Sequence, residues 1–210
     1  LLPTRYRFDK LMSEVIQTVS AELMNRSLEL QVSIAHDIPI MLYGDDIRIK
    51  QIFLYLLFNS VRSTDEGRIL LEVKGERDEK EHIVKLKCRV ADTGLGLSQM
   101  DIETVFGAYE RYDSRQGSNL KGLGLELSIC REILHLMDGE LKIESILGIG
   151  MAVTFEFCNY IAEDIPIVRL SEESNRRVLI YFGSSMEEDL WRTLMEHFNI
   201  RSEYAMGYNT

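Results

Sequence analysis

Helix-like and strand-like hydrophobic patterns follow one another along this chain without a regular strand–helix–strand alternation. Apolar residues recur at helical spacing over residues 9–25, 46–63 and 122–139. Short alternating or β-branched runs predict strands at residues 28–34, 69–74, 83–90, 141–145 and 151–157. This order favours an α+β fold, a two-layer α/β sandwich with helices on one face of a mixed sheet, over a doubly wound fold.

Composition and charge narrow the possible ligands. The chain has 210 residues, 45% of them hydrophobic and 28% charged, which is typical of a globular protein. No apolar run approaches the roughly 18 to 20 residues that cross a bilayer, so we expect no direct membrane contact by this chain. The 24 basic and 34 acidic side chains leave a net charge of −10, which repels phosphate polymers and anionic headgroups. Nucleic acid is therefore not expected as a ligand.

The cysteine pattern indicates a reducing environment. Cys88, Cys130 and Cys158 are odd in number, lie in apolar-rich segments and show no C-x-x-C spacing. We therefore expect three buried thiols and a cytoplasmic location, without a disulfide framework or a zinc site.

The first polar cluster lies on the helix predicted from residue 46 to 63. Asn59 is set among the apolar residues LYLLF. Such an amide is either a hydrogen-bonded core residue or a ligand, because an unpaired buried amide costs roughly 1 to 3 kcal/mol. A solvated helix face would give a similar pattern. The polar positions recur at intervals of three and four: Arg48, Gln51, Tyr55, Asn59 and Arg62.

The second cluster is VADTGLGLS, in which Asp92 ends an apolar strand and Gly94 and Gly96 follow. Glycines there let the backbone turn sharply and a flat ligand come close, while the carboxylate can accept a hydrogen bond from an exocyclic amine. A simple D-T-G turn between two elements is the alternative interpretation.

The third cluster is KGLGLELS, where Lys121, Gly122 and Gly124 immediately precede an amphipathic helix. Free amides at a helix N-terminus and a nearby ammonium together suit a phosphate group. The motif matches neither a Rossmann nor a P-loop signature, and a loop that merely enters a helix would also explain it. The polar stretch 110–121 before it has no apolar period and is expected to form a mobile loop.

Taken in order, the three clusters resemble the N, G1, F and G2 boxes of the ATP-binding catalytic domain of sensor histidine kinases, within the Bergerat-fold group. The matching segments are DDIRIKQIFLYLLFNSVRST, DTGLG, VFGAY and GLGL. The resemblance implies a catalytic domain over residues 1–158 that binds ATP and Mg²⁺. It assigns no catalytic residue within the chain.

The resemblance also implies a role for each box. Asn59 would bind the magnesium that bridges the nucleotide phosphates, and Arg62 would be a phosphate cation. Asp92 would bind the adenine amino group, and Gly94 and Gly96 would leave room for the nucleotide.

The remaining boxes would close over the phosphates. Phe106 and Tyr109 would anchor a lid over residues 110–121. The nucleotide-binding set of the last box would be Lys121, Gly122, Leu123 and Gly124.

Three positions depart from the family pattern. Tyr55 stands where these kinases usually carry a second Asn and where hydrolysing members of the group carry a Glu that activates water. A neutral phenol is a poor general base near pH 7, which disfavours simple ATP hydrolysis. Leu120 replaces a Gly of the last box, and Ala152 replaces a Thr near the adenine. We therefore keep two alternatives, a nucleotide-binding or scaffolding pseudokinase and a Bergerat-type ATPase.

The chain ends in a region that resembles part of another signalling domain. Residues 159–176 are expected to form a linker. The run from residue 177 resembles the opening strand and helix of a response-regulator receiver domain, with a further strand over 201–205. Phe182 and Gly183 stand where receivers carry paired acids for Mg²⁺, so this receiver-like segment over 177–210 is degenerate.

The resemblance places the phosphoacceptor histidine on dimerisation helices outside this chain. Those helices, ATP, and a response regulator or receiver domain are the expected partners of a two-component, hybrid sensor kinase. Its parent protein is compatible with a membrane anchor.

Overall fold

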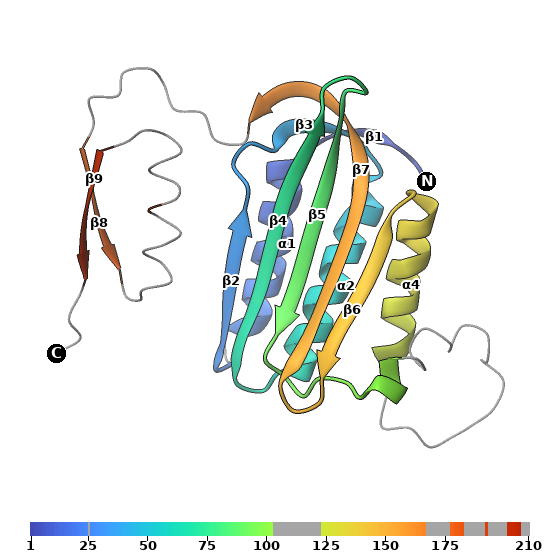
Figure 1. Cartoon of the computed structure of the whole chain (residues 1–210), viewed down its shortest axis with the longest axis vertical. Coiled ribbons are helices and arrows are strands. Elements are labelled where there is room, and N and C mark those ends of the chain that lie inside the picture. The colour runs from blue at the N-terminus through green and yellow to red at the C-terminus, as the bar shows by residue number, and fades with distance from the viewer. Residues whose placement is uncertain (25, 103–122, 167–176, 183–191, 193–200, 207–210) are drawn as a thin grey trace. The chain divides into compact units, whose positions relative to one another are not determined.

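The computed structural model describes residues 1–24, 26–102, 123–166, 177–182, 192 and 201–206 (Figure 1). They belong to two compact units, Leu1–Ile167 and Val168–Thr210. Among the described residues, the long helices of the first unit are α1 (Phe8–Leu23), α2 (Asp46–Ser63) and α4 (Leu123–Leu136), and residues 99–102 form a helical turn. Its strands are β1 (Thr4–Arg7), β2 (Leu28–Ile34), β3 (Pro39–Gly44), β4 (Gly67–Asp78), β5 (Ile83–Asp92), β6 (Glu140–Ile146) and β7 (Gly150–Pro166).

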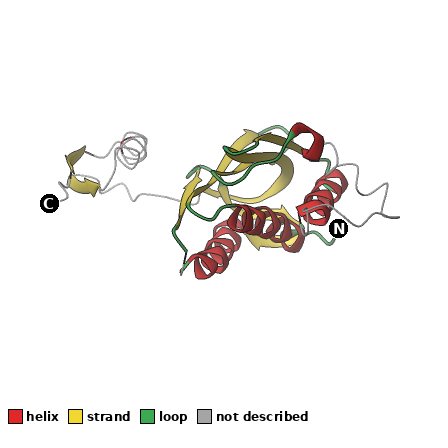
Figure 2. Ribbon diagram, turned by 90° about the horizontal axis from the view of Figure 1, so that it is seen from below, coloured by secondary structure: helices red, strands yellow, loops and turns green. Residues whose placement is uncertain are grey.

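The seven strands form one mixed sheet in the order β1-β3-β7-β5-β4-β2, with β6 also paired to β7. Strands β2 and β4 are parallel, and the other pairs are antiparallel. The three helices lie on one face of this sheet, and α2 packs between α1 and α4 (Figure 2). The predicted two-layer sandwich with helices on one face of a mixed sheet is confirmed.

Strand β5 shows how the alternation of side chains builds the core and then reaches the site. Its inward residues alternate with half-buried ones along the whole strand. Because successive side chains point to opposite faces, the last inward position is Asp92. The same periodicity that fills the core therefore turns a carboxylate toward the helices. The inward series is Val84, Leu86, Cys88, Val90 and Asp92.

The opposite face of the sheet carries ion pairs between neighbouring strands. Lys85 pairs with Glu156 at 2.5 Å, and Arg89 contacts Glu72 at 3.5 Å. These side chains are partly exposed, so each pair contributes little to stability. Such a face is typical of sheets that pack on one side only.

Helix α2 begins where its sequence provides a cap. The Asp45 side chain accepts a hydrogen bond from the Arg48 amide at 3.1 Å, which satisfies one of the free amides of the first turn. The apolar side of the helix then packs into the core. The inward side chains are Ile49, Ile52, Phe53, Leu56, Leu57, Asn59, Ser60 and Val61.

Strand β7 is longer than expected, and this corrects the linker predicted from residue 159. The strand continues to Pro166, and its second half pairs with β3. Neither β1 nor β3 was predicted, because both are short and lack a clear alternation. The start of a linker at residue 159 is therefore wrong: residues 159–166 complete the sheet.

The cysteines also differ in part from expectation. Cys88 and Cys130 are buried, and burial raises the pKa of the Cys130 thiol to about 12. Cys158 is exposed, contrary to the prediction. The alternation of β7 explains this, since Phe157 and Asn159 on either side point inward.

The second unit contains a parallel pair of strands, β8 (Arg177–Phe182) and β9 (Arg201–Met206). Both positions agree with strands expected from the sequence. The helix expected between them lies outside the described residues apart from residue 192, which is helical.

Candidate functional site

The Asp92 carboxylate is held at the end of β5 by two donors. Its Oδ2 accepts a hydrogen bond from the Ser60 hydroxyl at 2.8 Å, and its Oδ1 accepts one from the Gly94 amide at 3.0 Å. Burial raises the pKa of this carboxyl, while the hydrogen bonds from Ser60, Gly94 and the Met151 backbone act in the opposite direction. The result is a carboxylate with a fixed orientation and only 8% exposure.

Close backbone packing explains both glycines that follow Asp92. A Cβ on Gly94 would lie 2.3 Å from the Ser63 carbonyl oxygen, at the end of α2. Gly96 has a φ of +63°, and its Cβ would lie 2.2 Å from the Ile146 carbonyl oxygen. The Leu95 amide also donates to the Ser63 carbonyl at 3.0 Å. The turn is thus tied to α2 and to the β6–β7 connection, which keeps Asp92 beside the helix.

Asn59 is fully buried and only half satisfied. Its Oδ1 accepts a hydrogen bond from the Arg62 guanidinium, whereas its Nδ2 has no partner among the described residues. Because arginine carries only donors, Arg62 fixes which end of the amide faces it. A core asparagine normally satisfies both ends, so the Nδ2 group of Asn59 is a donor that no acceptor in the described part of the chain uses.

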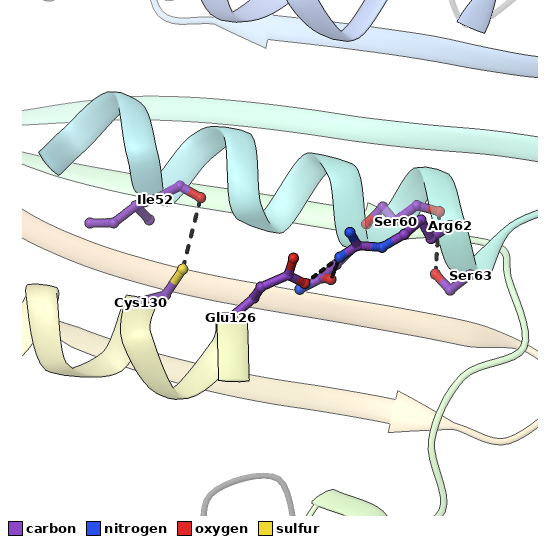
Figure 3. A network of polar contacts seen from close by, with 7 residues as sticks. Ile52, Ser60, Arg62, Ser63, Glu126 and Cys130 are labelled. Atoms are coloured by element: carbon purple, nitrogen blue, oxygen red, sulfur yellow. Dashed lines mark hydrogen bonds and ion pairs between the residues drawn. The ribbon is translucent and has the colours of Figure 1, made fainter. Parts of the chain in front are cut away.

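Arg62 also joins α2 to α4 (Figure 3). Its Nη2 donates to the Glu126 carboxylate as well as to Asn59. One turn further along α4, the Cys130 thiol points at the Ile52 carbonyl at 4.0 Å. The start of α4 is therefore held beside the end of α2, where the site residues lie.

The polar row predicted on α2 forms two hydrogen-bonded groups. Arg48 donates to Gln51 at 2.7 Å, and Gln51 donates to the Tyr55 hydroxyl at 3.0 Å. Asn59 and Arg62 form the second group. The Tyr55 hydroxyl, which replaces the usual residue of the family at this position, therefore has its hydrogen-bond partner on the same helix.

Part of the predicted site lies outside the described residues, namely Phe106, Tyr109, Lys121 and Gly122. The predicted lid over 110–121 lies there too. Leu123 and Gly124 open α4, so Gly124 belongs to the helix instead of preceding it.

Two residues of this region were not predicted. Ser60 was missed although it follows Asn59 and is a hydroxyl on an otherwise apolar helix face. Glu126 was missed although it is the acidic residue in the first turn of α4. Its charge, opposite to that of Arg62, was the available signal.

The side chains present fit a hard divalent cation. Mg²⁺ prefers oxygen ligands and commonly keeps waters and phosphate oxygens, so few protein ligands are needed. The oxygens of Asn59 and Glu126 both face the Arg62 cation. The described residues contain no group of three or more His, Cys, Asp or Glu that could hold a metal. A cation here would therefore depend on these oxygens and on the phosphates of a ligand.

Comparisons with known proteins show the family of the chain. Residues 44–160 match the family described as Histidine kinase-, DNA gyrase B-, and HSP90-like ATPase. The chain is 33% identical over 146 residues to hybrid signal transduction histidine kinase B of Dictyostelium discoideum, covering 70% of this chain and 7% of that protein. It is 29% identical over 161 residues to sensor histidine kinase RcsC of Escherichia coli (strain K12), covering 77% and 16%.

A solved structure shows the same fold. Full-length ShkA in complex with AMPPNP superposes with a TM-score of 0.69 at 21% identity, over 98% of this chain and 41% of that chain. The chain belongs to the Histidine kinase-, DNA gyrase B-, and HSP90-like ATPase family. It is a histidine kinase ATPase domain homologous to those of hybrid sensor kinases, and an ATP-binding role fits its fold.

Proposed function

We propose that the unit Leu1–Ile167 binds Mg-ATP where β5, α2 and α4 meet, for phosphorylation of a histidine on helices outside this chain. The observation that carries the proposal is the buried Asp92 carboxylate, oriented by the Ser60 hydroxyl and the Gly94 amide. Next to Ser60 in the sequence, Asn59 has an amide Nδ2 without a partner among the described residues. A base-recognising carboxylate and a phosphate-facing amide on adjacent elements suit a purine nucleotide.

The carboxylate favours adenine over guanine. Adenine presents an exocyclic amine, which donates to a carboxylate, whereas guanine presents a carbonyl oxygen at the equivalent position. Two acceptors facing each other in a buried site lose a hydrogen bond and leave both groups unpaired. ADP is therefore expected to bind at least about tenfold more tightly than GDP, which corresponds to roughly 1.4 kcal/mol.

Asn59 and Arg62 would serve the phosphate end of the nucleotide. A bound Mg²⁺ supplies charge neutralisation between the phosphates, and phosphoryl transfer depends mainly on positioning and electrostatics. Arg62 brings a permanent positive charge on a half-exposed side chain. Lys121, Gly122, Leu123 and Gly124 are proposed to complete this end, and Phe106 and Tyr109 to anchor a lid.

Transfer to a histidine is better supported than steady hydrolysis. The Tyr55 hydroxyl already accepts a hydrogen bond from Gln51 and is a weak general base near neutral pH. Incubation of the parent protein with radiolabelled ATP would distinguish the alternatives. Acid-labile phosphohistidine supports the kinase, phosphate release by this chain alone supports an ATPase, and binding without either reaction supports a pseudokinase.

The binding site itself is tested by calorimetric titration with ADP and GDP. Asp92→Asn should weaken ADP binding by at least about tenfold, because a donor replaces one acceptor oxygen. Asp101→Asn is the matched control, since the Asp101 carboxylate accepts a hydrogen bond from the Ser98 hydroxyl and has no assigned role in the site. Equal ADP affinities for both variants and the wild type would remove Asp92 from the site.

The rest of the chain fits a hybrid sensor. We propose that residues 177–210 begin a receiver-like domain that lacks the usual acid pair, because Phe182 ends β8. The proposed partners are the phosphoacceptor helices and a response regulator or receiver domain, in the cytoplasm. In the parts of the chain that the structure describes, no helix combines the length and apolarity needed to cross a bilayer.

A further inference from the structure

The Arg62 guanidinium stands between two oxygens from different helices. A single nitrogen, Nη2, donates to Asn59 Oδ1 on α2 and to Glu126 Oε2 on α4. Two oxygens bonded to one nitrogen lie within about 6 Å of each other, which is twice a normal N···O distance. The side chains of α2 and α4 therefore hold a positive charge between a neutral amide oxygen and a carboxylate.

The burial of the three groups is uneven. Asn59 is fully buried, and its Nδ2 has no partner in the described part of the chain. The Glu126 side chain is 23% exposed and the Arg62 side chain 49% exposed. The two oxygens thus sit on well-packed helices, whereas the cation between them is at the end of a long side chain that reaches solvent.

We infer that Glu126 is a second protein ligand, with Asn59, for the divalent cation that accompanies the nucleotide, and that the Arg62 nitrogen marks its position. This inference rests on the proposed nucleotide site. Two oxygens that bind Mg²⁺ from opposite sides are about 4 Å apart, so Asn59 Oδ1 and Glu126 Oε2 would have to move only slightly closer together to bind the same ion. Repulsion between a guanidinium and a divalent ion requires Arg62 to leave, and the nucleotide phosphates are its natural new partner.

Arg62 is then an internal competitor of the metal. In the absence of metal it neutralises Glu126, and in its presence it is released toward the phosphates. The measurable quantity is the metal coupling, defined as the ADP dissociation constant in EDTA divided by that in Mn²⁺. Loss of the Glu126 carboxylate should lower this ratio.

The test is calorimetric titration of the full chain with ADP, in EDTA and in Mn²⁺. Glu126→Gln should lower the metal coupling by about tenfold while metal-free ADP affinity is retained. Glu132→Gln is the matched control, because Glu132 lies on the same helix and contacts Arg131 instead.

A softer metal separates a ligand from a residue that only positions Arg62. Glu126→Cys should lose coupling with Mn²⁺ and regain it with Cd²⁺, which prefers thiolate ligands. If Glu126→Gln lowers the coupling but Cd²⁺ gives no rescue, or if coupling in Glu126→Gln equals that in Glu132→Gln, the inference is overturned. Failure of the proposed function has a different signature: ADP would bind neither in EDTA nor in Mn²⁺, or would bind to Asp92→Asn as well as to the wild type.

Discussion

The turn after Asp92 allows the cost of a steric clash at a glycine position to be measured separately from the cost of the backbone conformation. Gly96 and Gly148 both have positive φ, at +63° and +81°. A Cβ on Gly96 would lie 2.2 Å from the Ile146 carbonyl oxygen and 2.9 Å from that of Gly150, whereas one on Gly148 would meet nothing within 4 Å. Replacing either glycine by Ala therefore has the same cost of a left-handed backbone conformation, but only Gly96→Ala adds a steric clash.

The magnitudes follow from these two terms. The left-handed conformation costs an alanine about 1–2 kcal/mol, and the reduced freedom of the unfolded chain returns about 0.4–1 kcal/mol. Gly148→Ala should thus lower the free energy of unfolding by up to about 1.5 kcal/mol. Forcing atoms into a packed site adds about 1–3 kcal/mol, so Gly96→Ala should lose about 1–4.5 kcal/mol.

Urea unfolding followed by circular dichroism measures both variants. Gly96→Ala should also weaken ADP binding, because the displaced turn carries the Gly94 amide that orients Asp92. Equal losses of stability in the two variants would refute the steric argument.

Three further predictions concern the same end of the sheet and the length of β7. Ser60→Ala should lower the free energy of unfolding by about 1.5–3 kcal/mol in urea denaturation, since it removes a hydrogen bond to a buried carboxylate; an unchanged midpoint would contradict this. Burial raises the pKa of Asp92 in the folded protein, so the ionised carboxylate lowers the free energy of unfolding at pH values above that pKa. This loss of stability disappears as the pH falls through the raised pKa and the carboxyl is protonated. ADP affinity, in contrast, should fall over the same pH range in calorimetry, at higher pH than for an ordinary aspartate; a pH-independent affinity would show that the charge is not used. A chain that ends after Cys158 lacks the part of β7 that pairs with β3 and the buried Ile161, so circular dichroism should show an unfolded or strongly destabilised protein. A chain that ends after Ile167 keeps both and should melt cooperatively.

Local periodicity in the sequence was sufficient for most of the fold. Helix α2 and strands β2, β5 and β6 lie where the apolar patterns placed them, because each buries one regular face. Strand β3 and the second half of β7 were missed because they stabilise each other across a long sequence separation. Nothing local in the peptide around Pro39 or in residues 159–166 specifies that pairing.

The candidate site could be predicted only as separate motifs. Asp92 was placed at a strand end, and Asn59 on a helix, by residue type and spacing. Ser60 and Asp92 are 32 residues apart in the sequence, and Arg62 and Glu126 are 64 residues apart, yet each pair is in contact. Such contacts depend on how the helices pack, and a single sequence does not report that packing.

The central claim is that Asp92 and Asn59 face the same nucleotide. Amide-resolved NMR of the ¹⁵N-labelled chain titrated with ADP tests it most directly. We predict the largest shifts at the backbone amides of Gly94 and Leu95 and at the side-chain amide of Asn59, all lost in Asp92→Asn. Shifts confined to the opposite end of the sheet around Asn159, or unchanged by Asp92→Asn, would contradict the account.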